Sequence, residues 1–159
     1  AVLTRWTGLC YPMQVVWDEV HFAGFVNGYL TGSYFFDIHP PLGKLALAAS
    51  ATLGGYDGKT SWATIGNPLP EESVPLLFLR GLPALQGTLT VPLVYLTARE
   101  LGLSVPAALL SASGMLFDVC ALVESRYVLT DSTLLLAIIL QLWASVSSDR
   151  FAPLSREWL

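Results

Sequence analysis

The chain has 159 residues, of which 53% are hydrophobic and only 13% are charged. Soluble domains carry roughly a quarter of charged residues, so this composition indicates a protein that lies in lipid. The formal net charge of −4 comes with no basic patch of the kind that nucleic acid requires, which excludes nucleic acid as the expected partner. Cys10 and Cys120 form neither a CxxC motif nor a metal-ligand spacing, so we expect no metal site at the cysteines.

The first segment, residues 1–13 (AVLTRWTGLCYPM), is apolar and contains a single arginine, Arg5. It is too short to span a bilayer, and it lacks the basic start and the long apolar centre of a signal peptide. We therefore expect it to be the end of a preceding membrane helix. On this interpretation the chain is part of a larger multi-span protein and is incomplete on its own.

Residues 14–76 are more polar and contain several Gly and Pro turn signals, which predicts a sizeable loop outside the membrane. The first part of this loop is nevertheless rich in aromatic residues, which favour the headgroup level of a bilayer. Their spacing of three or four predicts a helix over 17–31 that lies on the membrane. A second interfacial helix is expected from Gly43 to about Leu53, where Gly54 ends it.

The last region, residues 77–159, holds three apolar stretches of about the length that a bilayer span requires, roughly 17 to 25 residues. The connections between them are too short to be anything but turns, so the helices should alternate in direction. The fold class that follows is an all-α integral membrane protein. The three membrane helices are expected at about 77–98, 105–123 and 127–147.

This helix count places the 14–76 loop and the short turn at 124–132 on the same face of the membrane. Ionisable groups near hydrocarbon are costly, about 2.5 to 3.5 kcal/mol at mid-bilayer, so they usually pair or line a cavity. We therefore predict a polar site at the membrane surface. The charged residues and histidines that meet there are Asp18, Glu19, His21, Asp37, His39, Lys44, Arg80, Glu124, Arg126 and Asp131.

A carboxylate beside cations and aromatic rings suits the transfer of a group from a lipid phosphate. The cations stabilise the departing phosphate, and a carboxylate takes the proton of the acceptor. A phosphate leaving group needs no proton, so one carboxylate suffices where a glycoside hydrolase generally uses two. Asp18 and Glu19 would point about 100° apart on a helix, which predicts different tasks for them.

Four motifs carry a family resemblance: WDEVHFAGFVNGYLTGSYFFDIHPPLGKL, LGGYDG, LRGLPALQGTLTVPLVYLTARELG and ESRYVLTDS. In this order and spacing, from about Arg5 to Trp143, they resemble the amino-terminal third of the protein O-mannosyltransferase family. The resemblance implies the C-type glycosyltransferase fold, in which the 14–76 loop is lumenal. It also implies an enzyme of the endoplasmic reticulum membrane, multi-pass, with its active face in the lumen.

The activity that the resemblance implies is the transfer of mannose from dolichyl phosphate mannose to Ser and Thr hydroxyls of secretory-pathway proteins, with inversion at the sugar carbon. The partners are then a lipid-linked sugar donor, a protein acceptor and the membrane. A dimer with itself or with a related mannosyltransferase is also implied. We expect no metal ligands and no cofactor beyond the donor, while the need for a divalent metal stays open.

The same resemblance assigns roles to individual residues. We expect Asp18 and Glu19 to be catalytic, with Asp18 as the base and Glu19 orienting the acceptor, although the choice between them stays open. His39 and Asp131 are expected to support this site. The residues expected to bind the donor phosphate are Arg80, Arg5, Lys44 and Arg126.

Other interpretations remain open at this point. Asp18 and Glu19 also suit the first turn of an ordinary helix, because acidic residues stabilise helix N-termini. Arg5 and Arg80 also suit snorkelling positions at the ends of spans. For function, the alternatives are a related C-type glycosyltransferase with another polyprenyl-phosphate sugar donor, or a non-catalytic membrane subunit that binds a lipid phosphate.

Overall fold

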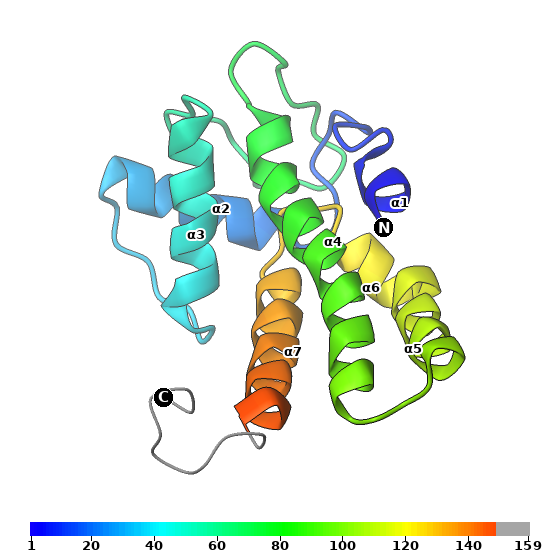
Figure 1. Cartoon of the computed structure of the whole chain (residues 1–159). Coiled ribbons are helices and arrows are strands. Elements are labelled where there is room, and N and C mark those ends of the chain that lie inside the picture. The colour runs from blue at the N-terminus through cyan, green and yellow to red at the C-terminus, as the bar shows by residue number, and fades with distance from the viewer. Residues whose placement is uncertain (149–159) are drawn as a thin grey trace.

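The computed structural model describes residues 1–148, within which all regular elements are helices. This confirms the predicted all-α fold class; the end of the 77–159 region lies outside the described residues. Figure 1 shows the arrangement. The helices are α1 (Val2–Trp6), α2 (Glu19–Thr31), α3 (Pro41–Leu53), α4 (Leu76–Glu100), α5 (Val105–Phe117), α6 (Val119–Glu124) and α7 (Asp131–Ser148).

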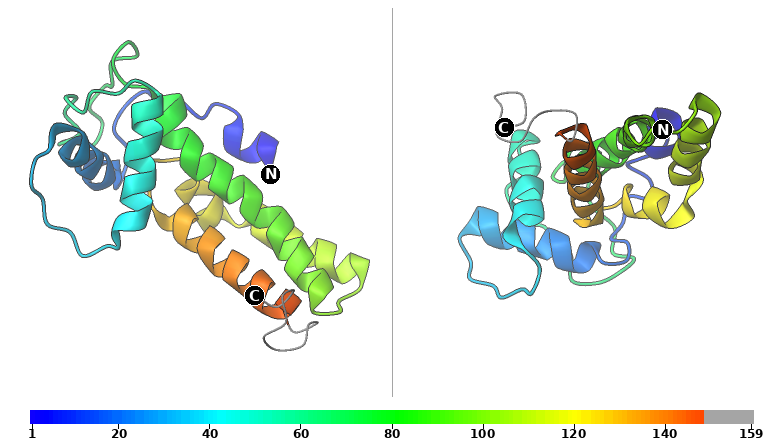
Figure 2. Two further views of the ribbon diagram at one scale, coloured as in Figure 1. Left: turned by 60° about the vertical axis from the view of Figure 1, so that its left-hand side comes forward. Right: turned by 60° about the horizontal axis from the view of Figure 1, so that its bottom comes forward.

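Within the described residues, α4 and α7 are the helices long and apolar enough to cross a membrane, with 25 and 18 residues. They lie side by side in both views of Figure 2. A hydrogen bond connects α4 and α7: the Thr133 hydroxyl donates to the Gln86 side-chain oxygen at 3.0 Å. The indole of Trp6 likewise donates to the Thr88 hydroxyl at 3.1 Å and ties α1 to α4. Such isolated polar contacts hold apolar helices in register.

The helix expected over 105–123 is interrupted. It consists of the 13-residue α5 and the short α6, which meet at Asp118, where the backbone is extended (φ −63°, ψ 118°). The Asp118 carboxylate accepts a hydrogen bond from the Ala121 N–H at 2.7 Å. Asp118 is therefore the N-cap of α6, because aspartate satisfies a free N–H at a helix start.

The two helices of the long loop form where the sequence places them, with shifted starts. α2 begins at Glu19 rather than at residue 17, because Trp17 has a φ of 48° and cannot be part of a right-handed helix. α3 begins at Pro41 rather than at Gly43, because proline is well suited to the first helical position. A shared apolar core lies between α2, α3, the start of α4 and the loops before α2, after α3 and before α7. It includes Val15, Phe22, Val26, Leu47, Tyr56, Trp62, Leu79 and Val128.

A close approach at Gly87 offers a test of how α4 packs. A Cβ at this position would lie 2.5 Å from the Ser125 Cβ and 2.9 Å from the Arg5 Nε. We expect Gly87→Ala in the full-length protein to lower the melting temperature in detergent, because overpacking costs about 1–3 kcal/mol. Gly114→Ala is the matched control, since this helical glycine of α5 faces open space. Equal melting temperatures for the two variants would contradict this packing.

Candidate active site

A buried ion pair joins Glu19, the first residue of α2, to Arg80 in the first turns of α4. Both side chains are completely buried. The Arg80 Nε and Nη2 atoms donate to the two Glu19 carboxylate oxygens, each at 2.8 Å. This bidentate geometry is the strongest form of an arginine–carboxylate contact. The Arg80 guanidinium also lies 5.2 Å from the centre of the Tyr127 ring.

The pair also holds backbone groups from distant parts of the chain. Glu19 accepts hydrogen bonds from the N–H groups of Val16 at 3.0 Å and Val128 at 3.1 Å. The other Arg80 hydrogen bonds go to the carbonyl oxygens of Leu9, Pro12 and Gln14, at 3.4, 2.9 and 3.0 Å. All five guanidinium N–H groups are thus used within the protein. Arg80 has no donor left for a ligand in this conformation.

Asp18 faces the opposite way. It is exposed, and its side chain makes no hydrogen bond with any residue that the structure describes. It lines a pocket of about 330 Å³, and neither Glu19 nor Arg80 reaches the wall of this pocket. The two adjacent acids therefore have different surroundings, as their angular separation predicts. The pocket is lined by Asp18, His21, Phe22, Phe25, Asp37, Ile38, His39, Thr130 and Asp131.

The pocket thus brings together Asp18 with both predicted supporting residues, His39 and Asp131. They come from three separate elements: the start of α2, the loop before α3 and the first residue of α7. Phe22 forms part of the floor and packs on the His39 ring, with 5.4 Å between ring centres. The arrangement combines an unpaired carboxylate with aromatic rings in an open pocket.

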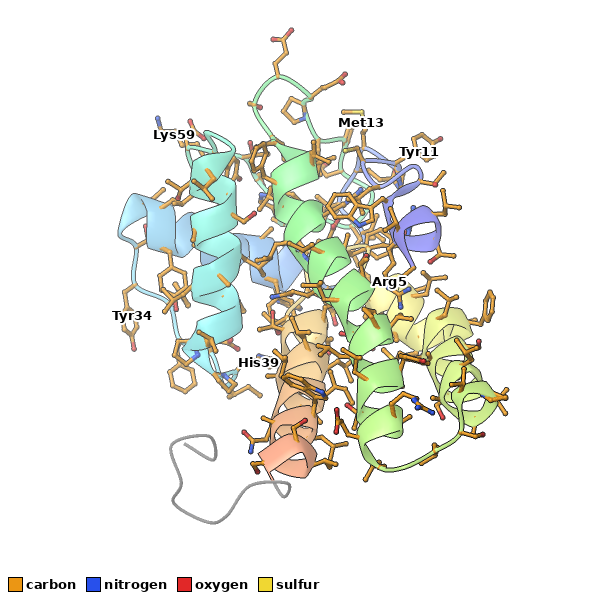
Figure 3. All side chains as sticks on the ribbon, viewed as in Figure 1. Arg5, Tyr11, Met13, Tyr34, His39 and Lys59 are labelled. Atoms are coloured by element: carbon orange, nitrogen blue, oxygen red, sulfur yellow. The ribbon has the colours of Figure 1, made fainter. Side chains whose placement is uncertain are left out.

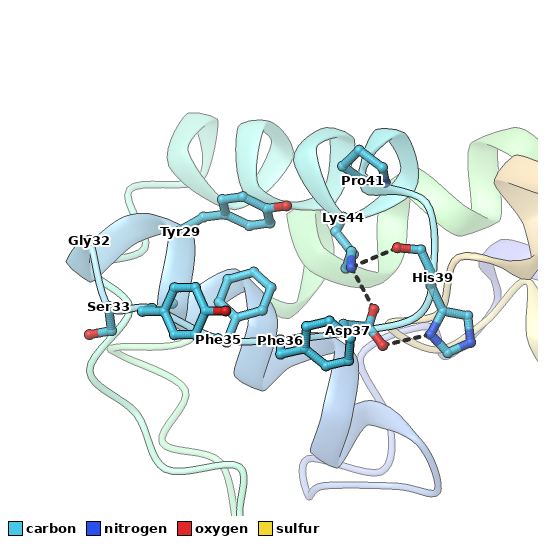
Figure 4. A pocket seen from close by; sticks show the side chains of 11 residues that line it. Tyr29, Gly32, Ser33, Phe35, Phe36, Asp37, His39, Pro41 and Lys44 are labelled. Atoms are coloured by element: carbon cyan, nitrogen blue, oxygen red, sulfur yellow. Dashed lines mark hydrogen bonds and ion pairs between the residues drawn. The ribbon is translucent and has the colours of Figure 1, made fainter.

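Lys44 lies beside the pocket in a network with Asp37 and His39, which Figure 4 shows. Its ammonium group donates to the Asp37 carboxylate and, at 3.0 Å, to the His39 carbonyl oxygen. The other Asp37 oxygen lies 2.9 Å from His39 Nδ1. Lys44 is only 3% exposed, and its charge lies over the rings of Phe25 and Phe35 at 5.1 and 5.7 Å.

Asp37 was not among the predicted site residues, although it lies on the predicted polar face. Burial opposes its ionisation, but the hydrogen bonds from Lys44 and His39 outweigh this and lower the pKa of the carboxyl to about 2. The low pKa of Asp37 arises from its contacts with His39 and Lys44, two and seven positions later in the sequence. The DxH spacing together with the lysine of α3 was the available signal.

Arg5 and Arg126 do not reach the pocket. Figure 3 shows Arg5 and His39 on opposite sides of α4. Arg5 is completely buried, and its Nη2 donates to the carbonyl of Met115 near the end of α5 at 3.5 Å. Arg126 donates to the carbonyl oxygens of Thr4, Arg5, Thr7 and Gly8, at 2.8 to 3.3 Å. It closes the C-terminal end of α1, because a cation there satisfies free carbonyls and the helix dipole.

Among residues 1–148, no group of three or more His, Cys, Asp or Glu side chains has an arrangement that holds a metal ion. The pocket lining contains three carboxylates, two imidazoles and two phenylalanine rings. Together, the fold and the site define an all-helical protein with two helices long and apolar enough to cross a membrane and a polar pocket where the second of them, α7, begins.

Comparison with known proteins identifies the family. The sequence model described as dolichyl-phosphate-mannose-protein mannosyltransferase matches residues 1–159. The chain is 42% identical over 99% of its length to dolichyl-phosphate-mannose–protein mannosyltransferase 4 of Candida albicans. It is 41% identical over 98% of its length to the protein of the same name in Schizosaccharomyces pombe. The chain belongs to the dolichyl-phosphate-mannose-protein mannosyltransferase family.

A solved structure agrees with this assignment. The fold matches a chain of the Saccharomyces cerevisiae protein O-mannosyltransferase Pmt1-Pmt2 complex bound to the sugar donor, with a TM-score of 0.93 and 36% identity. The match covers 99% of this chain and 21% of that one. The chain likewise spans 21% and 20% of the two curated relatives named above, about a fifth of their length.

Glu19→Gln tests the buried pair. This change leaves the Arg80 guanidinium buried without its counter-ion, and breaking a buried pair costs about 3–5 kcal/mol. We expect the full-length variant to lose most of its monodisperse folded fraction, measured by size-exclusion chromatography and by the melting temperature in detergent. Glu72→Gln, at an exposed glutamate of the long loop, is the control and should behave as wild type. A normal melting temperature for Glu19→Gln would contradict a stabilising role of the pair.

The Asp37 network predicts a stability change at acid pH. The pKa of Asp37 is lower in the folded protein than the value of about 3.9 expected in an unfolded chain. The stability that this carboxylate contributes is therefore complete above about pH 4 and is lost as the pH falls toward 2. We expect the melting temperature of the full-length protein to fall over this range, and Asp37→Asn to remove part of that fall. Asp57→Asn, at a carboxylate that is 55% exposed, should leave the profile unchanged.

Proposed function

We propose that the full-length protein carrying this sequence transfers mannose from dolichyl phosphate mannose to Ser and Thr hydroxyls of proteins, with inversion at the sugar carbon. The family membership and the names of its relatives support this activity. The observation that carries the proposal is the unpaired Asp18 carboxylate in a pocket with His39 and Asp131. A free carboxylate in an open pocket is available to a substrate, whereas Glu19 is fully engaged.

In the proposed reaction, Asp18 is the general base. The acceptor hydroxyl approaches the anomeric carbon of mannose on the face opposite the phosphate, and Asp18 removes its proton as the new C–O bond forms. The bond between the anomeric carbon and the phosphate oxygen breaks, and the phosphate leaves with the bonding electrons. A positioned base of this kind contributes about 10²–10⁴-fold to a rate.

The Glu19–Arg80 pair has a positioning role in this proposal. Glu19 follows Asp18 directly, and its carboxylate is fixed by two N–H groups of Arg80 and by two backbone N–H groups. The backbone of Asp18 is therefore held at one place relative to α4 and to the 125–130 turn. Small displacements of a catalytic group cost much of its effect, which favours such a rigid support.

Of the four cations predicted to bind the donor phosphate, Lys44 is the one whose hydrogen bonds go to residues of the pocket wall. Two of its three N–H groups are used by Asp37 and His39, which leaves one for a phosphate oxygen. We therefore propose that Lys44 contributes positive charge at the leaving group. For Arg80, Arg5 and Arg126 the phosphate role stays a prediction.

The same proposal places the pocket at the lumenal face of the endoplasmic reticulum membrane. It includes assembly with a second mannosyltransferase chain, since the structural neighbour is named as a Pmt1-Pmt2 complex. Purification from mild detergent with the partner captured by affinity tests the assembly. Recovery of monomer alone would argue against it.

The activity is tested with Asp18→Asn in the full-length protein. We expect transfer of mannose from dolichyl phosphate mannose to a Ser/Thr peptide to fall by about 10²–10⁴-fold, because the amide cannot accept the proton. Asp57→Asn, on the exposed loop, should keep the wild-type rate. Transfer at an unchanged rate in Asp18→Asn would remove the assignment. Transfer from a different polyprenyl-phosphate sugar, with none from the mannose donor, would favour a related glycosyltransferase.

A further inference from the structure

His39 is held in a fixed orientation by Asp37. The Asp37 carboxylate, whose other oxygen binds Lys44, lies 2.9 Å from His39 Nδ1. An ionised carboxylate is an acceptor only, so Nδ1 carries the hydrogen, and Nε2 of the neutral ring is left with its lone pair. Figure 4 shows this second nitrogen pointing away from Asp37. No residue of the described chain makes a hydrogen bond to it.

His39 lies where three cavities meet, which makes its Nε2 accessible from them. His39 lines the Asp18 pocket and also two neighbouring cavities, one of about 460 Å³ next to Lys44 and one of about 270 Å³ between α3 and α7. Its side chain is 50% exposed. His39 therefore lies between the Asp18 pocket and two other cavities and is open to solvent.

Several charged and titratable groups surround His39. Asp37 and Lys44 face it from the loop and from α3, and together they are neutral. Asp18 and His21 share the pocket from the α2 side, and Asp131 shares it from α7. Of these groups, Asp37 is the one within hydrogen-bond distance of the His39 ring.

We propose that His39 accepts the proton that Asp18 removes from the acceptor hydroxyl, and that Asp37 is its positioning residue. This inference rests on the proposed function. As the hydroxyl oxygen bonds to the anomeric carbon and the phosphate departs, the proton moves to the Asp18 carboxylate. Asp18 then passes it to His39 Nε2, and the imidazolium releases it to water. Asp18 is again ionised and His39 again neutral, so no other reactant is needed.

The test uses His39→Gln and His39→Ala in the full-length protein, assayed for mannose transfer between about pH 5 and pH 8, where histidine titrates. Both variants keep the Asp37–Lys44 ion pair, so the loop should fold. We expect kcat to fall by about 10- to 100-fold, with the KM for the donor nearly unchanged, because the loss concerns proton transfer rather than binding. The acid limb of the kcat profile should disappear. Added imidazole should restore part of the activity of His39→Ala, since the pocket is open.

Asp37→Asn provides a second arm. The amide favours the other tautomer, so kcat should fall, and the double variant Asp37→Asn/His39→Gln should be no slower than His39→Gln alone. Asp57→Asn is the matched control, because Asp57 also pairs with a basic residue two positions later, on an exposed loop. A wild-type kcat in His39→Gln would overturn the inference, as would a reduced kcat with an unchanged pH profile and no imidazole rescue. In those cases a large loss in Asp18→Asn would leave the proposed function intact, whereas wild-type transfer in Asp18→Asn would refute the proposed function itself.

Discussion

The structure depends on one buried ion pair. Two fully desolvated charges are expensive to bury, and their attraction offsets this cost only when the geometry is good and the remaining donors and acceptors are satisfied. Both conditions hold for Glu19 and Arg80, because every Arg80 N–H has an acceptor and both Glu19 oxygens accept two hydrogen bonds. The acceptors and donors lie on residues 9–16, α2, α4 and the 125–130 turn. The pair therefore fixes the position of α2 relative to the 125–130 turn, and both of these contribute residues to the pocket.

This arrangement explains why two neighbouring acidic residues are useful. Glu19 turns inward and is completely enclosed, whereas Asp18 turns outward into a pocket where it meets no partner. Glu19, whose side chain is anchored, is the first residue of α2, and Asp18, whose side chain is free, immediately precedes it. For the proposed reaction, this means that Glu19 makes the contacts that position Asp18, and the Asp18 carboxylate itself stays free to act as the base.

The coarse architecture could be predicted from the sequence, because it follows from local patterns. Helical spacing located α2 and α3 within two residues at their starts, and apolar length located α4 and α7. The sequence predicted one continuous helix over 105–123 and missed the interruption at Asp118. An aspartate inside an apolar stretch does not reveal from sequence that its side chain caps a new helix, as Asp118 caps α6. The start of α7 was placed four residues early because the Val128 N–H is engaged by Glu19, 109 positions away.

The site was harder to predict residue by residue. Sequence identifies which ionisable residues share a face, and Asp18, His39 and Asp131 indeed share one pocket. The sequence does not show which arginines donate their hydrogen bonds to distant carbonyl oxygens. Arg80 and Arg126 both do so in the structure. Their acceptors lie 66 to 71 and 118 to 122 positions away in the chain. Contacts of this range depend on tertiary packing, which no local pattern encodes.

The hydrogen bonds from Arg126 to carbonyl oxygens within residues 4–8 have a consequence for the synthesis of the protein. These bonds cannot form until position 126 has left the ribosome, and the Arg80 bonds to residues 9–14 cannot form until α4 has started to emerge. The contacts of residues 4–14 are therefore completed by parts of the protein that are synthesised after them.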